Sequence, residues 1–538
     1  MKRTLILVLL AASALAQMTE ISGERMRAHV KFLASDLLEG RAPGSRGGDL
    51  ATEYLAAQFA LLGARPAGGQ GTYFQKVTLV GVDPSPLSRL SMVAKDGKTT
   101  TFKWLDEFVG VTYAQKPDAQ FDAPAVFVGH GIVAPEYQWD DYRGVDVRGK
   151  AVVLFTGEPP SDDPRFFTGR ALTYYGRWTY KYEECTRHGA VACIIIHTTP
   201  TASYGWDVVR SSWGREDQQS RLAPGEAAIA LAGWVTKEMG DKLGAVVGRT
   251  ADELLIMADT PGFRAMDLPM RLSGSVPAKI RTVETRNVVA RIEGSDARVR
   301  NEAVVFSAHW DHLGVGNPVD GDAIYNGAAD NATGCGILLE LARAWAALPA
   351  KPRRSAIFLA TTAEEAGLLG SRFYGENPAV PAGKTAANIN FDMLMPFGRT
   401  SNVTMIGYER TTLAPLVEEA ARRFGFTISP DPRPDAGHYY RSDHFSLARV
   451  GVPSFSIDNG EELLGKPPGT GKKFRDEFDA KRYHQPSDEY RDDWDFSGME
   501  QYARLGMLIG VNVANLPKLP TWRAGDEFLP ARQKSGVR

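Results

Sequence analysis

The sequence predicts an α/β fold on a mixed sheet, with a second, β-rich part inserted into it. The first observation is a long and regular alternation of strand-like and helix-like segments after about residue 285, which is typical of a sheet covered by helices on both faces. The second is a series of short apolar runs bounded by Gly and Pro from about residue 120, which is typical of β-strands. The 538 residues of the chain are enough for two or three domains.

Two amphipathic helices are expected before the insert. Apolar residues recur at helical spacing through Met26, Val30 and Leu33, and again through Leu55 and Phe59. A loop rich in Gly and Pro joins the two segments. We expect these helices to belong to the same domain as the regular alternation that follows the insert.

The insert is expected to contain several short strands and one helix. The strand-like runs are APAVFVGHGIV, GKAVVLFTG, AVACIIIHTT and EAAIALAGW, and the helix-like segment is TYYGRWTYKYEECTRHG. The composition changes at both ends of this region. We therefore place the insert at 116–285, between two parts of the main domain at 17–115 and 286–538.

The main domain is expected to alternate between strands and helices after the insert. The predicted strands are RNVVARIEG, EAVVFSAHWD, SAIFLATTA, AANINFDML and VPSFSID. The predicted helices are GCGILLELARAWAAL, TLAPLVEEAARRFG and the late segment GMEQYARLGMLIGVNVANL. This order indicates a sheet whose strands are joined by helices.

Composition and charge argue against several classes of protein. The chain is 43% hydrophobic and 23% charged, which is ordinary for a globular protein. The formal net charge of −2 creates no general attraction to nucleic acid or to an anionic membrane. Three cysteines are too few for a disulfide framework, and a Cys185–Cys193 bridge is less expected than two free thiols.

The first residues have the pattern of a secretory signal peptide. Two basic residues precede an apolar run over 5–10, and an Ala-Leu-Ala sequence ends at Ala16. A membrane anchor is the alternative, but the apolar run is short for a bilayer, and no later stretch is long and apolar enough to span one. We expect residues 1–16 to be removed and the protein to be secreted or periplasmic, with Gln17 first.

Histidine and acidic residues stand at successive predicted strand ends. In an open α/β sheet, functional sites lie beyond the carboxyl ends of the strands. Several predicted strands end at a histidine or an acidic residue, and a late loop contains a tyrosine and a histidine. These residues are His309 and Asp311, Asp330 before a helix, Glu364 and Glu365, Asp392, and finally Tyr483 and His484 in the late loop.

Each of these residues also has an ordinary structural interpretation. Asp330 alone would be a helix N-cap, and Glu364 with Glu365 would be a favourable pair at a helix N-terminus. His484 alone would be a surface histidine. Four successive strand ends of this kind instead favour a site for divalent metal, because carboxylates packed closely together need a compensating cation.

Five motifs in this order resemble those of the M28 family of di-zinc aminopeptidases and carboxypeptidases. They are HWDHLG, NGAADNATG, TAEEAGLLGS, NFDML and YHQPSDEY. The segment HVKFLASDLLEGRAPGSRGGDLATEYLAAQF resembles the family's N-terminal helices, and the insert is similar to a protease-associated (PA) domain, above all in DVRGKAVVLFTG and CTRHGAVACIII. The resemblance implies a mixed-sheet zinc-peptidase domain of the phosphorylase/hydrolase-like type with an inserted PA domain.

The resemblance also implies a set of metal ligands for two zinc ions per chain. His309, Asp330 and Asp392 would hold one zinc ion. Asp330, Glu365 and His484 would hold the other, so that Asp330 bridges the two. The bridging ligand of this family precedes a cis peptide bond, and the bond after Asp330 is therefore expected to be cis.

Further roles follow from the same resemblance. Glu364 would be the general base that activates the water shared by the two metals, and Asp311 would orient the nearest histidine ligand. Tyr483 could donate a hydrogen bond to the oxyanion that forms on the substrate. Tyr439 and Tyr440 compete with it for this role.

Several functions remain open at this point. The leading hypothesis is a secreted aminopeptidase that removes N-terminal residues from peptides. A carboxypeptidase of the same family would need a cationic pocket for the substrate carboxylate, and Arg399, Arg433 and Arg441 lie in suitable loops. A single-zinc, glutaminyl cyclase-like transferase shares the fold, but the duplicated ligand set argues against it. A non-catalytic binding module would have lost ligands, and here all are present.

A serine-protease mechanism is not expected. Ser442, Asp443 and His444 are adjacent, and adjacent residues cannot form the relay of a catalytic triad. No Gly-x-Ser-x-Gly sequence surrounds the serine. We expect these three residues to support the neighbouring site structurally.

Overall fold

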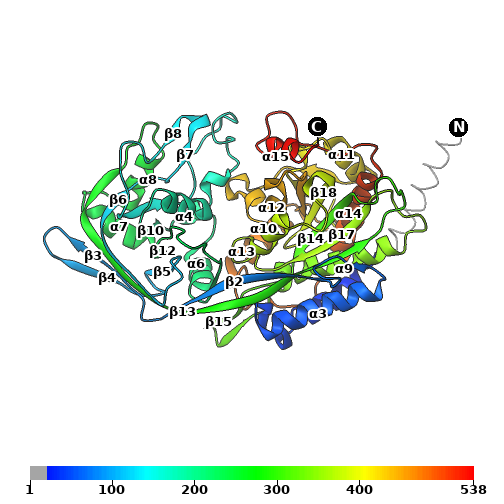
Figure 1. The fold of residues 1–538 in the computed structure, drawn as a ribbon, viewed down its shortest axis with the longest axis horizontal. Helices are drawn as coiled ribbons and strands as arrows, with labels where there is room; N and C mark the ends of the chain where they lie inside the picture. Colours follow the sequence, from blue (N-terminus) through cyan, green and yellow to red (C-terminus); the bar gives the residue numbers. More distant parts are fainter. Residues whose placement is uncertain (1–20, 538) are drawn as a thin grey trace. The chain divides into compact units, whose positions relative to one another are not determined.

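The computed structural model describes residues 21–537 and divides the chain into two compact units. The main unit comprises the residues up to Val77, Glu284–Pro432 and the residues from Arg441 onward, and the inserted unit comprises Thr78–Val283 with Arg433–Tyr440. Figure 1 shows the elements of both. The signal peptide expected at 1–16 lies outside the described residues. Among the described helices, none has the length and apolar character needed to cross a bilayer.

The main unit contains a mixed sheet whose central strands are parallel. Its strands, in spatial order, are β1 (Arg65–Pro66), β13 (Met266–Ile292), β17 (Ser355–Thr361), β14 (Ala303–His309), β18 (Thr385–Phe391), β21 (Ser454–Asn459), β19 (Asn402–Ile406) and β20 (Thr427–Ser429). Strands β17, β14, β18 and β21 run parallel. Every residue of β14, β17 and β18 is buried, because helices cover both faces of the sheet.

The helices that cover one face of this sheet include α2 (Gly23–Leu33), α3 (Arg46–Leu61), α9 (Thr333–Ala346) and α14 (Ser497–Asn515). Phe306 of β14 stacks on Phe358 of β17 with ring centroids 5.5 Å apart, and Trp345 of α9 meets Phe306 edge-on. Gly510 allows α14 to come this close, because a Cβ at this position would lie 2.3 Å from Cζ of Phe306. The resulting core holds the strands, and therefore their carboxyl ends, in fixed register.

The other face is covered by α10 (Leu369–Glu376) and α12 (His444–Arg449), which contribute Tyr374 and Leu447 to a second core. The main unit also contains the hairpin of β15 (Gly314–Val319) and β16 (Asp322–Tyr325). Its remaining α-helices are α11 (Ala414–Arg423), α13 (Thr470–Lys481) and α15 (Leu529–Lys534). The strands and helices predicted after residue 285 are all present, so the predicted fold class is confirmed.

The inserted unit has its own sheet. In spatial order its strands are β4 (Thr99–Phe102), β3 (Arg89–Ala94), the first part of β13, β6 (Asp118–Phe127), β9 (Ala151–Phe155), β10 (Ala192–Ile196), β12 (Leu231–Val235) and β5 (Phe108–Val111). One face packs on α4 (Trp178–Arg187) and α6 (Trp206–Trp213), and the other on α7 (Lys237–Ala245) and α8 (Ala251–Ala258). Smaller elements are α5 (Thr199–Ala202) and the strand pairs β2 (Phe74–Pro84) with β11 (Asp217–Ser220) and β7 (Val133–Ala134) with β8 (Trp139–Asp140).

The inserted unit begins at Thr78, whereas the change in composition places the start of the insert at 116. The physical reason is strand pairing over long sequence distances. Strand β3 pairs with β13, and β5 pairs with β12, so the segment before 116 completes the sheet of the inserted unit. Cys185 and Cys193 are buried thiols in this unit, with their sulfur atoms 2.9 Å apart.

Candidate metal centre

The residues singled out at the strand ends lie at one edge of the main sheet. His309 is the last residue of β14, and Asp392 directly follows β18. Glu364 and Glu365 lie in the loop after β17, and Asp330 lies just before α9. Since β14, β17 and β18 are parallel neighbours, their carboxyl ends bring these side chains together.

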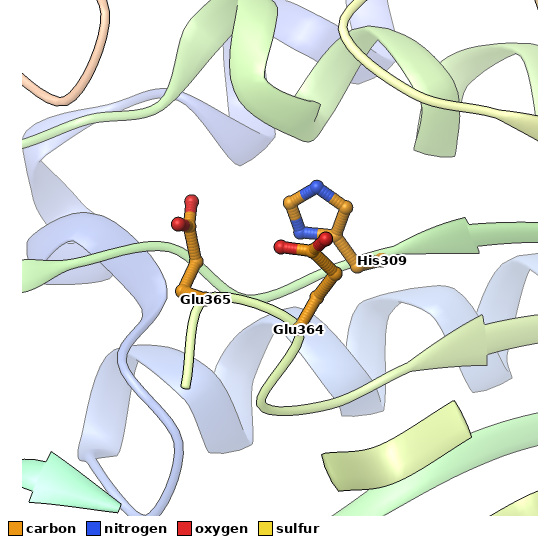
Figure 2. Close-up of side chains that lie close together, drawn as sticks. All are labelled: His309, Glu364 and Glu365. Atoms are coloured by element: carbon orange, nitrogen blue, oxygen red, sulfur yellow. The ribbon is translucent and has the colours of Figure 1, made fainter. Parts of the chain in front are cut away.

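The loop after β17 turns both glutamates toward the same space. Ala363 has a φ of +50°, a left-handed conformation that turns the chain sharply directly after the strand. The backbone N–H of Glu364 donates to Oδ1 of Asp311 at 3.2 Å, which fixes the loop. Figure 2 shows the carboxylate of Glu364 beside the His309 ring, with Glu365 pointing to the same side. Helix α10 begins only at Leu369, so the glutamates are not a pair at its first turn.

His309, Asp330 and Asp392 form the first group of candidate ligands. Nε2 of His309 is 3.2 Å from Oδ1 of Asp330 and 3.1 Å from Oδ1 of Asp392. The hydroxyl of Ser442 donates to the other carboxylate oxygen of Asp392 at 2.5 Å. This hydrogen bond fixes the Asp392 carboxylate, as expected for a residue that supports the site.

His484, Asp330 and Glu365 form the second group. Nε2 of His484 is 3.5 Å from Oδ2 of Asp330 and 3.0 Å from Oε2 of Glu365. The two carboxylate oxygens of Asp330 therefore face different histidines. The peptide bond between Asp330 and Asn331 is cis, which confirms the expectation for this position.

The charges of these residues fit divalent cations. Although burial works against its charge, hydrogen bonds from His309 and His484 lower the pKa of Asp330 to about 2. Burial raises the pKa of Asp311 to about 7 and that of Glu364 well above its usual range. Several carboxylates thus lie close together with few positively charged side chains beside them. Bound metal ions would compensate their negative charge. Imidazole and carboxylate groups are also the ligands that zinc takes in proteins.

Comparison with known proteins agrees with this geometry. Residues 287–505 match the model of the family described as Peptidase family M28. The chain carries a peptidase family M28 domain. The matched residues run from β13 into α14 and include every strand-end residue of the candidate centre.

Individual relatives resemble parts of the chain or its fold. A probable zinc metalloprotease of Pyrenophora teres f. teres (strain 0-1) is 35% identical over 112 residues, which are 21% of this chain and 23% of the relative. Leupeptin-inactivating enzyme 1 of Streptomyces exfoliatus is 25% identical over 177 residues, 33% of this chain and 36% of the relative. The chain thus matches about a quarter to a third of these relatives' length.

A solved structure shares the fold over nearly the whole length. The aminopeptidase from Aneurinibacillus sp. strain AM-1 superimposes with a TM-score of 0.56 at 19% identity, and the match covers 95% of this chain and 98% of that one. The shared fold therefore extends beyond the M28 domain to the inserted unit.

Two further predicted site residues lie beside the M28 ligand groups. The Asp311 carboxylate is completely buried, but Nδ1 of His309 is closer to the Asp311 carbonyl oxygen, at 3.2 Å, than to its carboxylate, at 3.9 Å. The ring of Tyr483 packs on that of His484 with centroids 4.0 Å apart. Burial raises the pKa of Tyr483 well above its usual range, which keeps its hydroxyl protonated. Tyr439 and Tyr440 belong to the inserted unit.

Two residues of the M28 domain were missed by the sequence analysis. His312 is completely buried, and its Nδ1 is 2.6 Å from Oε1 of Glu365. Asp488 is buried and accepts hydrogen bonds from the backbone N–H groups of Ala329 and Asp330, both at 3.0–3.2 Å. Both residues lie inside motifs given above, HWDHLG and YHQPSDEY, and an unexplained His or Asp within a motif was the available signal.

Asp488→Ala is expected to destabilise the apoprotein by about 1–3 kcal/mol. The change leaves two buried backbone N–H groups next to the cis peptide without an acceptor, and each unsatisfied buried donor costs free energy. Urea unfolding of metal-free protein measures this effect. Glu489→Ala, at the exposed neighbouring position, is the control and should change stability by less than about 0.5 kcal/mol. Equal stability of the two variants would show that the Asp488 hydrogen bonds contribute nothing.

Proposed function

We propose that the chain is a zinc-dependent exopeptidase with two metal ions, and that it acts as an aminopeptidase on peptides. The observation that carries the proposal is the position of Asp330. Its two carboxylate oxygens face His309 at 3.2 Å and His484 at 3.5 Å. A carboxylate shared in this way, with one further carboxylate on each side, suits a pair of metals better than a single ion.

The ligand sets follow from these contacts. His309, Asp330 and Asp392 would hold one zinc ion, and Asp330, Glu365 and His484 the other. Bound there, the two ions would supply Lewis acidity, which polarises a substrate carbonyl and makes a neighbouring water more acidic.

Glu364 is the candidate general base. Its carboxylate lies beside His309 (Figure 2), and its backbone is held by the carboxylate of Asp311 at 3.2 Å. The raised pKa of Glu364 suits a group that takes a proton from the attacking water and then gives it to the leaving amine. Asp311 would act through Glu364, by fixing the position of its main chain.

Tyr483 is the candidate donor for the developing oxyanion. A tyrosine hydroxyl is protonated at neutral pH, burial raises the pKa of Tyr483 further, and its ring is fixed against His484. A donor placed beside the ligands can stabilise the negative charge that develops on the carbonyl oxygen. Tyr439 and Tyr440 remain alternatives for this role.

The carboxypeptidase alternative rests on one observation, the charge of Arg441. Burial raises the pKa of Tyr483, and the charge of Arg441 opposes part of this rise; a cation beside the site could bind a substrate carboxylate. We prefer the aminopeptidase hypothesis because the Aneurinibacillus protein, which shares the fold over nearly the whole chain, is described as an aminopeptidase.

The function is tested with one set of peptides. Each peptide is offered with a free amino terminus, with an N-acetyl group, and with a C-terminal amide. An aminopeptidase should cleave the free and the amidated peptides and leave the acetylated one intact. A carboxypeptidase should instead cleave the acetylated peptide and leave the C-terminally amidated one intact. If protein with two bound metals hydrolysed none of the peptides, both functions would be rejected.

We also propose that the inserted unit is a PA domain and that the protein is exported. The signal-like segment 1–16 motivates the second proposal. N-terminal sequencing of protein collected from the periplasm or the medium should give Gln17 as the first residue. Exported protein that still begins at Met1 would contradict it.

A further inference from the structure

His312 has no role in the ligand sets given above, yet it lies against one of them. The residue belongs to the motif HWDHLG and is completely buried. Its ring packs on Gly327, where a Cβ would lie 2.4 Å from Cγ of His312. Gly327 also has a φ of +61°, which favours glycine. A side chain at this position would displace the ring, so the loop before Asp330 is shaped to accommodate His312.

The contact between His312 and Glu365 is close but is not an aligned hydrogen bond. Nδ1 of His312 is 2.6 Å from Oε1 of Glu365. Within residues 21–537, neither ring nitrogen of His312 nor this oxygen of Glu365 has a partner in hydrogen-bond geometry. Buried polar atoms are normally satisfied. Two nitrogen and oxygen donor atoms that lie this close without a mutual hydrogen bond have the arrangement expected of two ligands of one metal ion.

The surroundings of Glu365 place two histidines on one carboxylate. Oε1 of Glu365 faces Nδ1 of His312, and Oε2 faces Nε2 of His484 at 3.0 Å. The two imidazole rings are nearly perpendicular, at 80°, with centroids 5.8 Å apart. One ligand atom each of His312, Asp330 and Glu365 lie within 4.8 Å of one another. This is a set of nitrogen and oxygen donors suitable for zinc.

We propose that His312 is a ligand of the second metal through Nδ1, together with Asp330, Glu365 and His484. The inference rests on the proposed function, since it requires a second metal ion. It makes the two halves of the centre unequal, because the first metal would have one histidine and the second would have two. Additional imidazole shifts the preference of a site from Mg²⁺ and Mn²⁺ toward Zn²⁺.

The test measures metal binding rather than activity. Metal-free wild-type protein, His312→Ala and His312→Asn are titrated with Zn²⁺ against a chelator, and folding of each apoprotein is checked by circular dichroism. In His312→Ala the Kd of the second metal should rise by at least about 10–100-fold, because the loss of a hydrogen-bond partner behind a ligand already costs this much affinity. The Kd of the first metal should change little. His197→Ala removes another buried histidine, in the inserted unit, and is the matched control.

His312→Asn separates a ligand from a residue that only orients Glu365. The amide N–H of asparagine can replace an Nδ1–H donor, but asparagine does not replace imidazole as a nitrogen ligand of zinc. Binding of the second metal should therefore stay weak in His312→Asn. Recovery of wild-type affinity in this variant, or an unchanged Kd in His312→Ala, would overturn the proposal.

A crystal structure of the wild-type protein with Zn²⁺ gives a second test that needs no variant. Nδ1 of His312 should lie about 2.0–2.1 Å from the second ion, and a separation above about 3 Å would overturn the assignment. Failure of the underlying function looks different. Wild-type protein that binds fewer than two metals would reject the two-metal centre itself, whereas two bound metals with His312 uninvolved would reject only this inference.

Discussion

Glu364→Gln should lower kcat by about 10²–10⁴-fold, the usual contribution of a general base, while both metals remain bound. Glutamine keeps the size of the side chain but cannot accept the proton of the attacking water. The backbone N–H that donates to Asp311 is unchanged, so the loop should keep its conformation. Steady-state kinetics and metal analysis of the same preparation measure the two effects.

Glu365→Gln is the matched control, because the change is chemically identical at the adjacent residue. It should weaken binding of the second metal first, since Oε2 of Glu365 lies 3.0 Å from His484. If neither glutamate took part in metal binding or proton transfer, both variants would keep their metals and their activity. A fully active Glu364→Gln enzyme would remove the proposed mechanism.

Asp330→Ala should abolish the binding of both metals and with it all hydrolysis. The two oxygens of this carboxylate face different histidines, so one substitution removes a ligand from each half of the centre. The loss of affinity should exceed the roughly 10–100-fold cost of removing an outer hydrogen-bond partner. Isothermal titration of the metal-free variant with Zn²⁺ measures both sites.

Two controls define this result. Asp392→Ala should affect only the first metal, because Asp392 contacts His309 and not His484 in the ligand groups described here. Asp322→Ala, at the first residue of β16, removes an acidic side chain that belongs to neither ligand group and should bind two metals normally. Retention of one metal at wild-type affinity by Asp330→Ala would show that Asp330 does not bridge.

The strand ends were predictable because a parallel α/β sheet makes them neighbours. Apolar runs such as those of β14 and β17 are recognisable from the chain alone, and the residue after each run must then lie at the same edge of the sheet. The sequence alone therefore predicts that His309, Glu364 and Asp392 lie close together. The bridging position of Asp330 came from the resemblance to the M28 family and not from periodicity.

The missed features depend on contacts that sequence patterns do not encode. Strand β13 extends over Met266–Ile292, and only its pairing partners reveal that it enters two sheets. Asp488 binds backbone groups of the loop before α9, far away in sequence, and an aspartate in a loop looks the same whether or not it does so. The role of His312 depends on the orientation of a ring against Gly327, which spacing alone cannot specify.

The order of the ligands along the chain has a consequence for the timing of maturation. Four candidate ligands of the two groups, His309, Asp330, Glu365 and Asp392, precede His484 by many residues. At a typical 5–20 residues per second, about 10–35 s pass between synthesis of His309 and of His484. A growing chain therefore cannot complete the second half of the centre until nearly all of it has left the ribosome. The candidate centre therefore stays incomplete during most of the chain's own synthesis.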